Sequence, residues 1–90
     1  MTNAVPVPIE KTRDLFAKII RSLVDDESVV RVAVETRGSQ TVIRVDAASA
    51  DIGKLIGKQG RNARALRVLI GEIGLVQGVS YALDIAQPSN

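Results

Sequence analysis

The apolar residues of this chain follow two different spacings, and the order in which those spacings alternate limits the fold that the chain can form. In residues 9–24, apolar side chains recur three and four positions apart, which places them on one face of a helix. In residues 30–35 and 79–85, apolar and other residues alternate, as in strands with one face in solvent. The apolar face expected for the helix consists of Phe16, Ile19, Ile20 and Leu23.

The middle of the chain predicts a hairpin followed by two helices. Gly38 lies in a short polar link before a β-branched run at residues 41–45, so residues 30–45 are expected to form a β-hairpin. A short helix is expected over residues 49–56, with Ser49 as a candidate N-cap. A second helix is expected over residues 61–73, with Gly74 as its terminator. Its predicted buried face is Ala63, Leu66, Ile70 and Ile73.

The predicted element order is therefore helix, strand, strand, helix, helix, strand. This order favours an α+β fold, a two-layer α/β sandwich in which three helices cover one face of a three-stranded sheet. We expect one domain over residues 9–86, preceded by a flexible segment at residues 1–8 and followed by a tail at residues 87–90.

Composition argues against catalysis. The 90 residues contain no His and no Cys, which removes the usual general base and any thiolate metal site. We expect no catalytic residue, no metal, no cofactor and no small-molecule substrate, and the acidic residues at positions 25–28 are interpreted as a solvated turn. The apolar runs are too short to cross a membrane and the start lacks a secretory signal, so the expected location is cytoplasmic.

Positive charge is concentrated in one stretch of the chain. Residues 52–71 contain five cations and no acid, whereas the rest of the chain holds 7 cations and 10 acids; the net charge is only +2. A basic patch on an otherwise non-basic body indicates a directed contact with an anion. The five cations are Lys54, Lys58, Arg61, Arg64 and Arg67.

The sequence Gly-Lys-Gln-Gly at residues 57–60 lies at the centre of this basic stretch. Gly57 and Gly60 have no Cβ, so a sugar-phosphate backbone could approach the main chain closely. Gly60 also precedes a helix whose free N–H groups and positive dipole end favour a phosphate. Lys58 and Arg61 add positive charge at the same place. The alternative is a plain helix–turn–helix connection whose glycines only permit a tight turn.

The run from Ile56 through the Gly-Lys-Gln-Gly residues to Arg61 resembles the signature loop of KH domains, and the element order resembles their prokaryotic type II arrangement. The resemblance covers residues 9–85, and a chain of this length is similar to the small bacterial KH-domain protein A family. This resemblance implies single-stranded RNA as ligand and a role as an RNA chaperone or post-transcriptional regulator. It also implies a homodimer, or a complex with a larger KH-domain protein B, and a link to cell-wall homeostasis and cell-length control.

Aromatic residues are too few for base-stacking platforms, since Phe16 and Tyr81 are the only two. Recognition would then rest on backbone clamping and an apolar groove, which KH domains use for about four nucleotides. Ile43 and Val45 could floor such a groove, although core burial is the stronger expectation for both. The predicted RNA-binding residues are Gly53, Lys54, Ile56, Gly57, Lys58, Gln59, Gly60, Arg61 and Arg64.

Several of these positions have a second interpretation. Ile56 is expected to serve both the core and the groove. Gly53 could admit a nucleotide or a partner, or could allow close packing of helix on sheet, and the sequence does not separate the two. Arg61, Arg64 and Arg67 share one helical face; the first two are assigned to phosphate and Arg67 to solvation.

Two other classes of function also have features in this sequence. Residues 53–59 resemble a P-loop, but they have three residues between the glycines instead of four, and Gln59 stands where a hydroxyl would bind magnesium. A protein-docking or dimerisation module is the remaining alternative, with Leu55 and Ile56 facing a partner. RNA binding is preferred because the loop combines small glycines with cations.

Overall fold

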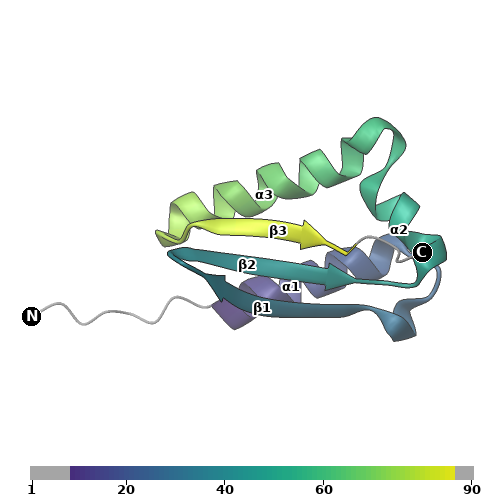
Figure 1. Ribbon diagram of the computed structural model, residues 1–90, viewed down its shortest axis with the longest axis horizontal. Coiled ribbons are helices and arrows are strands. Elements are labelled where there is room, and N and C mark those ends of the chain that lie inside the picture. The colour runs from purple at the N-terminus through teal and green to yellow at the C-terminus, as the bar shows by residue number, and fades with distance from the viewer. Residues whose placement is uncertain (1–8, 87–90) are drawn as a thin grey trace, which may run out of the picture.

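A computed structural model describes residues 9–86 of the chain, so the expected flexible segment at residues 1–8 and the expected tail at residues 87–90 lie outside the described residues. The elements follow the predicted order (Figure 1). They are α1 (Ile9–Leu23), a 3-10 turn (Glu27–Val29), β1 (Arg31–Arg37), β2 (Gln40–Asp46), α2 (Ser49–Ile56), a second 3-10 turn (Lys58–Gly60), α3 (Arg61–Gln77) and β3 (Tyr81–Ile85).

The three strands form one mixed sheet with β2 at its centre. β1 and β2 are antiparallel, with Val34 opposite Ile43, whereas β2 and β3 are parallel, with Ile43 opposite Leu83. A parallel neighbour requires a crossover connection, and α2 and α3 provide it. The three helices lie on one side of the sheet (Figure 1), which confirms the predicted α+β sandwich and is consistent with a type II KH fold.

The core lies between the sheet and the helices. Phe16 and Ile20 of α1 are fully buried there, as the helical spacing predicted, while Leu23 at the end of the same helix remains 39% exposed. Each fully buried side chain of this size contributes about 1.5–3 kcal/mol relative to an exposed one. The other core residues include Val30, Ile43, Val45, Ile52, Leu55, Ala63, Leu66, Ile70, Leu83 and Ile85.

Helix α3 does not end at Gly74, so that prediction was wrong. Gly74 is buried inside the helix, and an added Cβ there would collide with the carbonyl oxygen of Val79. The Val79 N–H donates to the Gly74 carbonyl oxygen at 2.9 Å. Because Gly74 has no side chain, the chain at Val79, just before β3, can pack closely against α3. Gly78, with a φ of 72°, is the residue that ends the helix.

A polar cluster holds the last turn of α3. Tyr81 donates its hydroxyl proton to Oε1 of Gln77 at 2.7 Å, and the Gln77 amide donates to Oγ1 of Thr12 at 3.0 Å. These hydrogen bonds connect α3 with both β3 and α1. They favour continuation of the helix beyond the residue at which local sequence predicts a stop.

The start of α2 also differs from the prediction. Ala48 occupies the N-cap position without a side-chain hydrogen bond, and Ser49 is the first residue inside the helix. The proposed Ser49 cap is therefore wrong. The backbone N–H groups of Asp25 and Asp26 instead donate to the buried carboxylate of Asp51 in the first turn of α2, at 3.2 and 3.0 Å. This carboxylate joins the segment after α1 to α2.

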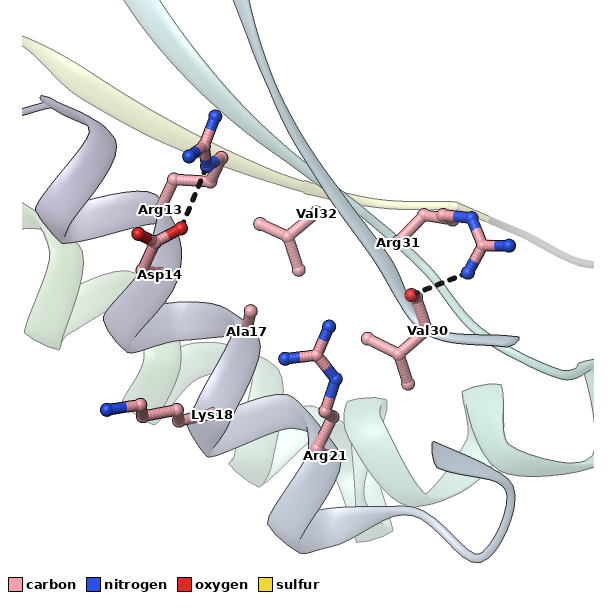
Figure 2. Close-up of a pocket in the computed structure, with 8 residues that line it drawn as sticks. All are labelled: Arg13, Asp14, Ala17, Lys18, Arg21, Val30, Arg31 and Val32. Carbon is pink, nitrogen blue, oxygen red and sulfur yellow. Dashed lines mark hydrogen bonds and ion pairs between the residues drawn. The ribbon is translucent and has the colours of Figure 1, made fainter. Parts of the chain in front are cut away.

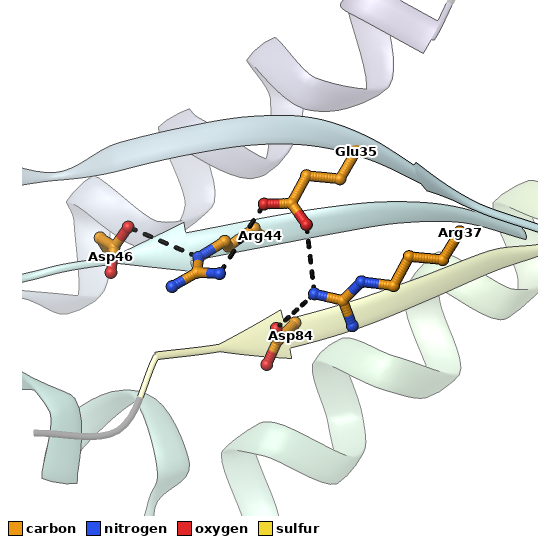
Figure 3. Close-up of polar contacts among 5 residues, drawn as sticks. All are labelled: Glu35, Arg37, Arg44, Asp46 and Asp84. Carbon is orange, nitrogen blue, oxygen red and sulfur yellow. Dashed lines mark hydrogen bonds and ion pairs between the residues drawn. The ribbon is translucent and has the colours of Figure 1, made fainter.

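The face of the sheet opposite the helices carries paired charges (Figure 3). Arg37 of β1 donates to Glu35 at 3.1 Å and to Asp84 of β3 at 3.3 Å, so it spans the central strand. Arg44 lies near Glu35 and Asp46. Val42 is two residues from Arg44 on β2, so it points to this same face, yet it is only 1% exposed. The charged side chains therefore cover an apolar residue where no helix does.

Within residues 9–86, no helix combines the length and the apolar composition that a membrane crossing requires. In the same range, no group of three or more acidic, His or Cys side chains is placed to hold a metal ion.

Candidate nucleic-acid interface

The Gly-Lys-Gln-Gly residues form a tight turn between α2 and α3. The Gly57 N–H donates to the Gly53 carbonyl oxygen at 2.8 Å, and the Gly60 N–H donates to the Gly57 carbonyl oxygen at 3.0 Å. Gly57 and Gly60 have φ values of 78° and 75°. Within residues 9–86, Gln59 is the only residue other than glycine that has a positive φ, at 57°. The loop therefore has one defined backbone shape.

Packing within the fold favours glycine at position 57. An added Cβ would lie 2.7–2.9 Å from the side chain and backbone nitrogen of Asn62 in the first turn of α3. Asn62 also donates its side-chain amide to the Lys54 carbonyl oxygen at 2.7 Å, which fixes it against the end of α2. At Gly60 an added Cβ would meet only a flexible Arg64 nitrogen at 3.5 Å, so there the left-handed backbone is what favours glycine.

The tip of the loop is accessible. Lys58 and Gln59 are exposed, while Gly57 and Gly60 are half-buried. Gly60 occupies the N-cap of α3 and no side chain caps this helix. The N-terminal N–H groups of a helix, together with its dipole, attract an anion. The loop thus presents a cation, an amide and a helix N-terminus on one accessible surface.

Two arginines flank this surface. Arg61 is exposed in the first turn of α3. Arg64, one turn later, donates to the Gln59 carbonyl oxygen at 2.9 Å. A guanidinium has five N–H donors, so Arg64 can hold the loop and still offer donors to a phosphate. Arg67 is exposed further along the helix, away from the loop.

Lys54 is in a different environment from Lys58. It forms ion pairs with Asp25 and with Asp51, the latter at 3.7 Å. The hydrogen bond to Asp25, followed by the charges of Asp25 and Asp51, raises the pKa of Lys54. The backbone N–H groups of Asp26 and Asp25 lower the pKa of Asp51, and Lys54 adds to that effect. The positive charge of Lys54 is thus already compensated within the protein, although Asp51 is the only acid near it in the sequence.

The outer surface of α2 is open beside the loop. Gly53 is exposed, and an added Cβ would meet no atom within 4 Å, so it does not serve close packing of helix on sheet. Ile56 is partly buried against the core. Ile43 and Val45 are both fully buried, in agreement with the stronger expectation for them. The structure therefore brings Gly53, Ile56, the loop, Arg61 and Arg64 to neighbouring positions.

Sequence reasoning missed two residues at this site. Asn62 lies inside the basic stretch, directly after Arg61, but nothing in its local context shows that it packs on Gly57. Asp25 is 29 positions from Lys54, and it reaches Lys54 only through the packing of α1 near α2.

Several known proteins are similar to this chain over most of its length. The family model described as "KhpA/KhpB, KH domain" matches residues 13–85. The RNA-binding protein KhpA of Aquifex aeolicus is 42% identical over 78 residues, covering 83% of this chain and 95% of that protein. The proteins of the same name from Chlamydia pneumoniae and Bacillus subtilis are each 37% identical. Those matches cover 83% and 80% of this chain, and 96% and 89% of the respective relatives.

Proposed function

The chain belongs to the KhpA/KhpB family of KH domains, and from this premise we propose that it binds single-stranded RNA through the loop of residues 57–60. The observation that carries the proposal is the exposed Lys58 and Gln59 at the uncapped N-terminus of α3. The relatives are named RNA-binding proteins, and this supports the same ligand.

The proposed mechanism is a backbone clamp. A phosphate would approach Gly57 and Gly60, accept hydrogen bonds from N–H groups at the start of α3, and meet the charges of Lys58 and Arg61. Arg64 would hold the loop and contribute a further donor. Bases would lie along α2 beside Gly53 and Ile56, in the manner of KH domains that accommodate about four nucleotides. Lys54 contributes less, because its charge is paired with Asp25 and Asp51.

The wider role is proposed from family resemblance. We propose an RNA chaperone or post-transcriptional regulator without catalytic activity, acting in the cytoplasm, and assembling as a homodimer or with a larger KH-domain protein B. The proposed biological setting is cell-wall homeostasis and cell-length control. Subcellular fractionation and isolation of complexes from the source bacterium test the location and the partner.

A protein-docking or dimerisation module is the second candidate function. The observation that favours it is the outward face of α3, where Val68, Leu75 and Val76 are 64%, 77% and 89% exposed. Apolar side chains gathered on one exposed helix face are typical of contact surfaces. The two functions are compatible, because these residues follow the loop along the helix and do not include it.

RNA binding across a salt series tests the first function. A labelled single-stranded RNA is titrated with the wild-type chain and with a Lys58→Asp, Gln59→Asp double variant. Aspartate tolerates the left-handed conformation at position 59, so this variant changes charge with little backbone strain. Binding should weaken with salt, with a log–log slope of about −0.7 for each phosphate contact, and the variant should lose it.

The matched control is an Arg67→Asp, Ser80→Asp double variant, which makes the same change of charge at exposed positions outside the loop. It should bind RNA nearly as the wild type does. Equal binding by the loop variant and the control would rule out the loop as the clamp. Absence of binding at low salt, together with concentration-dependent association of the chain, would favour the docking module.

A further inference from the structure

A second concave surface lies between α1 and β1, separate from the loop (Figure 2). Its volume is about 570 Å³, within the range of about 300–1,000 Å³ that is usual for small-ligand sites. Ala17 and Val30 on its floor are buried, and Val32 is half-buried beside them. The cavity therefore has an apolar floor formed by α1, by the residue before β1 and by the inner side of β1.

Cations surround this floor. Arg13 and Arg21 come from α1, and Arg31 from the start of β1. Figure 2 shows the Arg13 and Arg21 side chains on the two sides of Ala17, while Lys18 extends outward from the helix. With Asp14 as the one lining acid, the lining residues carry a net charge of +3, more than the +2 of the whole chain. A local excess of positive charge outside the loop region thus lies on a concave surface.

Most of this charge is uncompensated. Arg13 pairs with Asp14 at 3.1 Å. Within residues 9–86, Arg21 and Arg31 form no ion pair. Arg31 donates to the carbonyl oxygens of Val30 and Ser28 at 3.1 and 3.3 Å, which holds its guanidinium at the rim. Arg21 therefore remains able to bind an anion above the floor. Arg31 alternates with Val32 along β1 and lies across the strand from Arg21 in Figure 2, so it adds its charge from the rim.

We propose that this α1–β1 cavity binds a nucleoside phosphate, with the phosphate on Arg21 and the base against Ala17, Val30 and Val32, while Arg31 adds positive charge from the rim. Guanidinium groups bind phosphate through paired hydrogen bonds and also stack on bases, whereas the apolar floor suits the face of a base. The nucleotide is either one unit of an RNA strand or a free mononucleotide. The site does not depend on the loop, because β1 lies at the other edge of the sheet from β3, which packs against α3.

The test uses the full chain, labelled with nitrogen-15, and two probes: adenosine 5′-monophosphate and an oligouridylate of about 12 nucleotides, roughly three times the length that a KH groove holds. Backbone amide shifts of Ala17, Val30 and Val32 report on the cavity, and those of Lys58 and Gln59 report on the loop. An Arg21→Glu, Arg31→Glu variant should weaken nucleotide binding at the cavity by about tenfold or more, because it removes the charge-assisted hydrogen bonds.

A Lys11→Glu, Arg67→Glu variant makes the same change of charge at exposed positions outside the cavity and should bind like the wild type. Shifts of the cavity amides with the oligonucleotide alone identify an RNA unit as the ligand, and shifts with the mononucleotide alone identify a free nucleotide. If neither probe moves these amides, or if the Arg21→Glu, Arg31→Glu variant binds like its control, the proposal is wrong. The Lys58→Asp, Gln59→Asp variant should retain mononucleotide binding at the cavity, so failure of the loop proposal would be seen separately.

Discussion

Replacing Gly57 by alanine tests whether the fold itself needs glycine at the first position of the loop. The backbone there has φ 78° and ψ 170°, a region that is essentially restricted to glycine and costs other residues about 1–3 kcal/mol. The new Cβ would also lie 2.8 Å from the backbone nitrogen of Asn62, which cannot move without shifting the start of α3. Overpacking of this kind costs about 1–3 kcal/mol.

The loop can relieve part of this cost. Asn62 could turn away from position 57, but it would then lose the hydrogen bond to the Lys54 carbonyl oxygen, worth about 0.5–1.5 kcal/mol. We therefore expect Gly57→Ala to lower the free energy of unfolding by about 2–4 kcal/mol. That is a large fraction of the stability of about 5–15 kcal/mol that is usual for a domain.

Gly53→Ala is the matched control, four residues earlier in the same segment. Position 53 is inside α2, and an added Cβ would meet nothing within 4 Å. The substitution should raise stability by about 0.5–1 kcal/mol, because alanine favours the helix over glycine. Urea unfolding should then separate the two variants by about 2–5 M in midpoint, for an m-value of about 1–1.5 kcal/mol/M.

An unfolding midpoint of Gly57→Ala at or above that of the wild type would refute this reasoning. Glycine at position 57 would then be explained by ligand approach alone, and RNA affinity would be the property to measure. A fall in the midpoint of Gly53→Ala would equally contradict the open environment described for that residue.

Three further predictions follow from the packing. Gly74→Ala should destabilise the fold by about 1–3 kcal/mol, because the new Cβ collides with the Val79 carbonyl oxygen. Gly71→Ala, where an added Cβ meets nothing within 4 Å, should be neutral or stabilising. Equal urea midpoints for the two variants would contradict this. Asp51→Asn should lower the free energy of unfolding at neutral pH. The folded pKa of Asp51 is lowered, so its contribution is lost as the carboxylate is protonated, and the difference in stability between variant and wild type should narrow below about pH 4. A difference independent of pH would contradict the charge argument. Ile43→Val should cost about 0.5–1.5 kcal/mol in thermal or urea unfolding, since Ile43 is fully buried, and no measurable loss would argue against tight packing at the sheet centre.

Periodicity predicted those parts of the fold that depend on local spacing. Helix α1, expected over residues 9–24, spans Ile9–Leu23, and the last strand, expected over residues 79–85, spans Tyr81–Ile85. In both elements the buried face repeats at the period of the element itself, so neighbours along the chain were sufficient. The loop between two helices was predicted from its two glycines and from its resemblance to the signature loop of KH domains.

Contacts between distant residues decided the rest. Gly74 is typical of a helix end by local rules, but the approach of Val79 makes it an interior residue. Lys54 belongs to an acid-free run after Asp51, yet Asp25 pairs with it from the segment that follows α1. Val42 belongs to a β-branched run that shows no clear alternation, so its position beneath the charges of the open face required the register of the sheet.

The parallel pairing of β2 with β3 gives the loop a second constraint. The chain must return along the length of the sheet between these strands, and the loop is the point at which α2 gives way to the returning helix α3. One inserted residue that was taken up as an extra helical residue at the start of α3 would rotate the face of α3 by about 100° relative to α2. Leu66 and Ile70 would then leave the core, and Tyr81 would no longer arrive opposite Thr41. Surface loops usually tolerate insertions, but the length of this one is set by the strand alignment on which the last edge of the sheet depends.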